Sequence, residues 1–288
     1  MRRALVVGLL LFPGVARADL GDFPSSEAAR PLLATPGLTE IETQAAWVHA
    51  PDVYGADARI AAAPAGVITS AIGAEIAGRY GLFKSFEISF REPWTFALNT
   101  RAHEGATSGS GRARLGLSWT PPWTASGVDV AIDGALVLPT TAHVFRTDAT
   151  GAVHPDHLSV GGSLRAKYLL SDDDAAHVEG GFLFPFANSD DRAADRVPPA
   201  SFFVSAGSIF QLGERAWVDA AAGVTRTNRE RIATGIVPQS DQFLVDAHPA
   251  IGLSPTRWYD LILTASLPVA GKNTSQAYSV GAVVRARF

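Results

Sequence analysis

The sequence predicts an all-β fold: a single antiparallel transmembrane β-barrel of about twelve strands, with short periplasmic turns and longer extracellular loops. Three features predict it. The N-terminus is basic and then apolar, residues 39–288 repeat segments that alternate apolar and polar side chains, and the chain ends on Phe288. A soluble sheet would bury the apolar side of each strand in a protein core. The prediction therefore depends on hydrocarbon being the solvent for that side.

The N-terminus has the organisation of an export signal. Met1 is followed by two arginines and then by an apolar run, and residues 16–18 read Ala-Arg-Ala. This order predicts a signal peptide over residues 1–18. The apolar run is shorter than the roughly twenty residues that a membrane-spanning helix needs. Residues 19–38 are rich in Pro without periodicity, so we expect a periplasmic lead-in or a small plug there, and the barrel over residues 39–288.

Composition excludes several classes of protein. The chain has no Cys, which excludes disulfides and thiolate metal or redox centres. A net charge of -4 and a pI of about 6.0 give no basic footprint for nucleic acid. The mean hydropathy of +0.13 fits a barrel, whose polar lumen dilutes its apolar belt. We expect no cofactor and no metal; the expected partners are outer-membrane lipid, the barrel-insertion machinery and a small-molecule solute.

Alternation and connection length predict the strands. The predicted segments are residues 40–49, 67–80, 86–91, 112–119, 128–138, 160–168, 178–186, 202–211, 216–227, 242–253, 258–267 and 278–288. Their connections alternate in length. The shorter ones are residues 121–126, 171–175, 212–215 and 254–257, and the longer ones are 140–156, 188–199, 228–241 and 268–275. A transmembrane barrel has this alternation, whereas a Greek-key sandwich has no reason for it.

The last strand carries a further signal. Tyr278 and Phe288 share its apolar face, and Gly281 lies seven positions before the end. A strand that ends in Phe resembles the C-terminal signal by which bacterial outer-membrane barrels are recognised for insertion. We therefore expect Tyr278, Gly281 and Phe288 to form the insertion signal, and the outer membrane to be the location.

The face opposite the apolar one is charged on most segments, which predicts a charge-lined lumen. The signs complement each other between neighbours, as with Glu40 and Glu42 across the seam from Arg285 and Arg287. Opposite charges on adjacent strands stabilise a pair by roughly 0.2 to 1 kcal/mol. The lumen-lining candidates are Glu40, Glu42, Glu75, Arg79, Glu87, Arg91, Arg112, Arg114, Asp129, Asp133, Arg165, Lys167, Glu179, Asp219, Asp246, His248, Asp260, Arg285 and Arg287. Such pairing favours a narrow path over a free-diffusion pore.

Aromatic residues near the strand ends are candidates for the interfacial girdles of a barrel. They are Trp47, Tyr80, Trp119, Tyr168, Trp217, Trp258, Tyr259 and Phe288. We expect most of them to lie at the two rims.

Residue types used in metal sites occur in one long connection: His143, Asp148, His154, Asp156 and His157. Imidazole and carboxylate groups bind several divalent metals. In a loop, however, such residues are usually just solvated, so we assign no metal site.

Residue types used in catalysis occur at Asp246 and His248, two apart on one face and near Asp260. They fit a proton-linked or catalytic pair, or simply a lumen network. An outer-membrane phospholipase would need a Ser–His pair, with His and Ser two residues apart on one strand, and an Asn in support. We assign no such pair and predict that the chain is not an enzyme.

Several short stretches resemble an outer-membrane family. They are Arg79–Leu82 with Phe86–Phe90, Arg112–Leu117, Ala135–Thr140 and Leu267–Gly271. Together they are similar to the proteins described as belonging to the MetA pathway of phenol degradation, a group of outer-membrane transporters. The family's Leu-Pro-Thr-Gly is here Leu-Pro-Thr-Thr. The resemblance implies a channel or transporter for small hydrophobic or aromatic compounds and assigns no residue to the solute.

Two other functions stay open at this point. One is a structural or surface-interaction barrel without transport, in which the outer loops carry the function. The other is an outer-membrane lipid-modifying enzyme.

Overall fold

The computed structural model describes residues 23–62, 70–98, 107–110, 113–122, 126–138, 157–187, 197–232 and 235–288. The predicted signal peptide and Arg112 lie outside these ranges, as do His143, Asp148, His154 and Asp156. No helix among the described residues has the length and hydropathy needed to cross a membrane.

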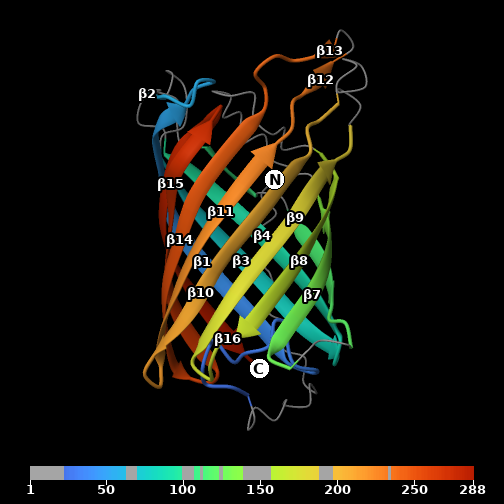
Figure 1. The fold of residues 1–288 in the computed structure, drawn as a ribbon, viewed down its shortest axis with the longest axis vertical. Helices are drawn as coiled ribbons and strands as arrows, with labels where there is room; N and C mark the ends of the chain where they lie inside the picture. The colour runs from blue at the N-terminus through green and yellow to red at the C-terminus, as the bar shows by residue number, and fades with distance from the viewer. Residues whose placement is uncertain are drawn as a thin grey trace, which may run out of the picture.

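The described residues form a closed antiparallel barrel of 12 strands (Figure 1). In order around the ring the strands are β1 (Thr39–Tyr54), β3 (Ser70–Phe83), β4 (Phe86–Leu98), β6 (Arg114–Trp119), β7 (Val128–Val137), β8 (Ser159–Leu169), β9 (Asp174–Pro185), β10 (Ser201–Leu212), β11 (Ala216–Thr227), β14 (Gln242–Thr256), β15 (Tyr259–Lys272) and β16 (Thr274–Arg287). Pairing of β16 with β1 closes the ring. Closure leaves no unpaired sheet edge, as hydrocarbon requires. The predicted fold class is confirmed.

Four short strands lie outside this ring. β2 (Ile60–Ala62) pairs with the end of β1, and β5 (Thr107–Ser110) pairs with the end of β4. β12 (Arg231–Ile232) and β13 (Gly235–Ile236) form a small hairpin beyond the barrel, at the top of Figure 1.

Connections are short at one end of the barrel and mostly long at the other. Residues 84–85, 170–173 and 213–215 make short turns at the end where the chain enters β1 and leaves β16. In outer-membrane barrels the short turns are periplasmic, so we call this the periplasmic end.

One predicted long loop is wrong. Only Asn273, with a φ of 51°, separates β15 from β16, where the sequence suggested a connection over residues 268–275. The sequence predicts that Pro268 is a loop residue, but it lies within β15 opposite Asp246, next to a register shift. A proline is tolerated at such an irregularity because the ladder there does not need its missing N–H. Both strands therefore continue beyond the predicted boundary.

Large apolar side chains cover the outside of the barrel. Leu263 is 61% exposed, Val204 56% and Leu164 53%, and each lies in the middle part of a strand. A soluble monomer does not expose a continuous belt of this kind. The alternate residues face inward and are largely charged or small. The fold is therefore that of an outer-membrane β-barrel, with lipid outside and polar groups within.

The aromatic girdle prediction holds for most members but fails for Trp217. Trp258, Tyr259 and Phe288 are exposed next to the periplasmic turns. Trp217 is only 4% exposed and packs inside the barrel with Ile262 and Val283. A Cβ added to Gly252 would lie 2.0 Å from the indole, so a glycine is needed there to make room for the ring. Period-2 alternation from Ala216 places Trp217 on the inner face.

Candidate functional site

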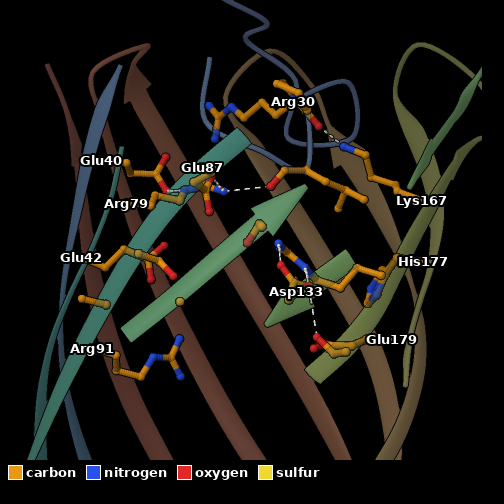
Figure 2. A pocket seen from close by; sticks show the side chains of 18 of the residues that line it. Arg30, Glu40, Glu42, Arg79, Glu87, Arg91, Asp133, Lys167, His177 and Glu179 are labelled. Carbon is orange, nitrogen blue, oxygen red and sulfur yellow. Dashed lines mark hydrogen bonds and ion pairs between the residues drawn. The ribbon is translucent and has the colours of Figure 1, made fainter. Parts of the chain in front are cut away.

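A cavity of about 850 Å³ occupies the lumen. Many of the predicted lumen residues line it: Glu40, Glu42, Arg79, Glu87, Arg91, Arg114, Asp133, Arg165, Lys167, Glu179, Asp219 and Arg285. Figure 2 shows Arg79 between Glu40 and Glu87 on one side of this space, with Lys167 and Glu179 on the other. The remaining described candidates lie nearby in the strands and are placed below.

The periplasmic end of the lumen contains the N-terminal segment, residues 23–38. Barrel side chains bind its backbone directly. The amide of Ala34 donates to Glu87 over 2.5 Å and that of Leu32 to Asp129 over 3.3 Å. Arg79 donates to the carbonyl of Leu32 over 3.0 Å. These partners belong to β4, β7 and β3, so the segment contacts one large arc of the wall.

The same segment also contacts strands in the rest of the ring. The carbonyl of Arg30 accepts from Lys167 on β8, while its guanidinium donates to Asp260 on β15 over 3.0 Å. Glu27 pairs with Arg285 on β16 over 2.9 Å. Its amide donates to Gln211 on β10 over 3.3 Å. Residues 23–38 are therefore tied to strands on all sides of the opening.

Gly81 provides the closest approach between the segment and the wall. Its carbonyl accepts from the amide of Gly37, and its amide donates to the carbonyl of Leu38. A Cβ at this position would lie 2.3 Å from the carbonyl oxygen of Thr35 and 2.5 Å from that of Ala34. Only glycine allows the two backbones this close.

Asp260 is the centre of a buried ion network beneath the segment. Its side chain is 0% exposed and accepts from Arg30, from Arg287 at 2.5 Å and from Ser254 at 2.7 Å. Phe23 lies against the guanidinium groups of Arg30 and Arg287, with the ring centroid 5.6 and 5.1 Å away. A buried charge is retained only when its lone pairs are used in this way.

The seam charges meet as predicted. Glu40 lies opposite Arg287 and Glu42 opposite Arg285 in the β1–β16 register. Glu40 accepts from Arg287 over 2.7 Å and also from Arg79 over 2.6 Å. Glu42 accepts from Arg285 over 2.6 Å. The barrel therefore closes through charge-assisted hydrogen bonds.

Farther from the periplasmic end the charges also pair. Asp133 binds Arg165 at 2.7 and 2.8 Å. Glu75 lies 3.2 Å from Arg91, as its level in the hairpin suggested.

Two lumen histidines each contact an acid: Asp219 lies 2.9 Å from His177, and Asp246 lies 3.0 Å from His248. In the sequence His177 shares the polar face of its segment with Glu179, but it was not among the lumen candidates.

Inside the lumen, the register pairs charged residues differently from their order along the chain. Lys167 lies opposite Asp129 and His177, and it is Arg165 that lies opposite Glu179. Arg114 lies opposite Val137, and Asp133 opposite Ser118. The order of charges along the chain is not enough to identify partners, because turn length sets the register.

The sequence does contain the His–Ser spacing of a phospholipase, at His157-Leu158-Ser159, so the prediction that assigned no such pair needs correction. The structure gives the pair a structural contact. The Ser159 hydroxyl donates to the backbone carbonyl of His157 over 3.3 Å, and the two residues are 0% and 2% exposed. That hydroxyl does not face lipid.

No group of three or more metal-ligating side chains occurs among the described residues.

The residues that sequence reasoning missed lie mostly in the N-terminal segment. Phe23, Glu27 and Arg30 occur in a stretch without periodicity, so no face could be assigned to them. Phe203 and Ile209 also line the cavity although they are apolar. Their alternation on β10 was the available signal, but both faces of that strand contain large apolar residues.

The fold and the charged lumen define an outer-membrane β-barrel, and two solved structures share its architecture. An outer-membrane channel from Pseudomonas putida F1 is similar with a TM-score of 0.70 and 14% identity, over 94% of this chain and 100% of that chain. The NanC porin is similar with a TM-score of 0.56 and 6% identity, over 85% of this chain and 98% of that chain. At these identities the likeness concerns the fold. No protein-family model matches the sequence, and no curated protein does.

Proposed function

We propose that this chain is a non-enzymatic outer-membrane channel for small hydrophobic or aromatic compounds, with a narrow lumen that residues 23–38 constrict at the periplasmic end. The observation that carries the proposal is the cavity of about 850 Å³ inside a closed barrel. Ligand sites for small molecules have volumes of about 300–1,000 Å³. A solute of that size fits the space, whereas a barrel whose interior were filled by side chains would be only structural.

The N-terminal segment supports a gated path over a wide pore. Its backbone is bound by side chains of several strands, so it reduces the opening without being part of the wall. We propose that residues 23–38 form the plug that the sequence suggested as one alternative for residues 19–38. The wide-pore porin architecture has no need for such a segment, since more strands leave an aqueous channel.

The test is solute flux through the purified barrel in liposomes. We expect phenol, as a neutral aromatic probe, to enter faster than through protein-free liposomes, and ion conductance in planar bilayers to be small. A barrel that folds, shown by heat-modifiable gel migration, yet passes neither ions nor phenol would overturn the proposal. That result would favour the structural or surface-interaction function. Release of fatty acid from the liposome lipid would instead favour the lipid-modifying enzyme.

A further inference from the structure

The lumen cavity has an apolar side as well as a charged one. Phe203 and Ile209 of β10 line it directly. Apolar side chains on the lumen side of a membrane barrel are unexpected, because that face is normally polar. They give the cavity a surface that an apolar solute can contact.

The Phe203 ring lies over a glycine of its neighbouring strand. In the β9–β10 register it lies opposite Gly181. A Cβ on Gly181 would lie 2.7 Å from two atoms of the Phe203 ring. The glycine therefore leaves the space that the ring occupies, and the ring remains part of the cavity lining. An aromatic ring in the lining can stack with an aromatic solute and pack against an aliphatic one.

The charged side of the cavity presents two arginines that lie opposite each other. Arg91 of β4 pairs with Arg114 of β6 in the register, and both line the cavity. Like charges directly opposite each other on adjacent strands are unfavourable unless another charge compensates. Around the ring β7, β8 and β9 separate β6 from β10, so the arginines face the apolar side from across the lumen.

The accessible charge on that side is positive. The side chain of Arg91 is 52% exposed, and its ion pair with Glu75 uses the Nε atom. The acids are less accessible: the side chain of Glu75 is 21% exposed and that of Asp133 10%. Of the acids that line the cavity, Asp133 is engaged by Arg165 and Asp219 by His177, and Glu179 lies opposite Arg165 in the register. A solute that enters therefore meets guanidinium groups before it meets free carboxylates.

We propose that the cavity selects small carboxylates with an aromatic or aliphatic body, the carboxylate binding Arg91 and Arg114 while the body contacts Phe203 and Ile209. This inference rests on the proposed channel function and names its solute class. A guanidinium group binds a carboxylate through two parallel N–H···O bonds, which gives both strength and orientation. The opposed arginines, the aromatic lining and the cavity size all fit one such molecule.

The test compares three probes of one shape in liposomes: benzoate, benzyl alcohol and benzylamine. We expect benzoate to enter fastest and benzylamine slowest. Arg91→Gln lowers benzoate flux by about tenfold, the effect of losing one charge-assisted hydrogen bond, and leaves benzyl alcohol flux unchanged. Arg91→Lys keeps the charge without the planar fork and gives an intermediate benzoate flux. The control is Arg59→Gln, because Arg59 is exposed near β2 outside the barrel ring.

A second pair of variants tests the contact between the solute body and Phe203. Phe203→Ala lowers the flux of benzoate and benzyl alcohol but not that of acetate, whereas Phe202→Ala, on the lipid side of the same strand, changes none of them.

The ranking in the unaltered protein decides the inference even if a variant fails to fold. Equal entry of the three probes, or fastest entry of benzylamine, overturns it and leaves the channel function intact. Entry of none of them contradicts the channel function itself.

Discussion

At the scale of single residues, Asp260 shows how a charge is stabilised at the periplasmic end. It has no exposed surface and binds the guanidinium groups of Arg30 and Arg287. We expect Asp260→Ala to lower the free energy of unfolding by about 3 kcal/mol, near the low end of the range for a broken buried pair. The low end of the range applies because, in the variant, Arg30 still has its ion pair with Glu27 and Arg287 still has its ion pair with Glu40. Urea unfolding in detergent measures this effect.

The matched control is Asp57→Ala. Asp57 pairs with Arg59 at 3.4 Å, with side chains 63% and 87% exposed, and exposed ion pairs contribute at most about 1 kcal/mol. An equal decrease in the free energy of unfolding in the two variants would show that the buried network does not stabilise the protein more than an exposed ion pair does.

Glu27 makes the attachment of the N-terminal segment sensitive to pH. Burial raises the pKa of its carboxyl, but Arg285 and Arg30 lower the pKa more, to below the ordinary value of 4.5. A carboxyl with a lowered pKa stabilises the folded arrangement above its ordinary pKa, and this stabilisation is lost as the pH falls through the lowered value. We therefore expect the segment to be bound at neutral pH and to loosen below about pH 4.5.

A fluorophore on a single Cys introduced at Ala29 measures that release. Glu27→Gln should loosen the segment already at neutral pH and remove the part of the acid response that Glu27 contributes. Identical pH profiles for the two proteins would assign the response to other carboxylates.

At the scale of elements, the segment over residues 23–38 and strand β3 fit together through Gly81. A larger side chain there meets the carbonyl oxygens of Thr35 and Ala34, which are backbone atoms and cannot rotate away. We expect Gly81→Val to displace the segment and to raise single-channel conductance above that of the unaltered barrel. Gly73→Val is the control, because Gly73 has the same inward orientation on β3 but no backbone atom closer than 3.9 Å. A rise in both variants, or in neither, would mean that the segment does not limit conductance.

Elements were predictable from the sequence where alternation alone determines them. All 12 ring strands fall where period-2 patterning indicated. The boundary between β15 and β16 was predicted in the wrong place, because Pro268 usually indicates a loop. Here a register shift allows the proline to lie within a strand. Residues 23–38 bind by backbone groups and isolated charges, which leave no periodic pattern. Their contacts appear only once the barrel brings together residues more than a hundred positions away, such as Arg30 and Asp260.

At the scale of the whole molecule, closure could be predicted because both ends of the chain contain charges of opposite sign. Glu40 lies opposite Arg287 and Glu42 opposite Arg285, so the complementary charges meet at the seam as predicted. The interior pairings of Lys167 and Asp133 could not be predicted, since each depends on the length of a turn. The two-sided lumen was also not predictable, because Phe203 and Ile209 face inward although β10 has large apolar residues on both faces.

The molecule as a whole depends on hydrocarbon outside and water within. Leu263 is 61% exposed on the outer face of β15, and Thr264 follows it on the inner face. A lysine on the lipid face near the middle of the membrane costs about 2–4 kcal/mol, whereas lumen substitutions chiefly change selectivity. We expect Leu263→Lys to lower the free energy of unfolding from lipid bilayers by about this amount and Thr264→Lys to lower it by much less. Folding measured by gel migration over a series of urea concentrations tests both. If the two lysines are equally costly, or if the cost of Leu263→Lys is the same in detergent-free buffer, the outer face contacts protein or water and not lipid.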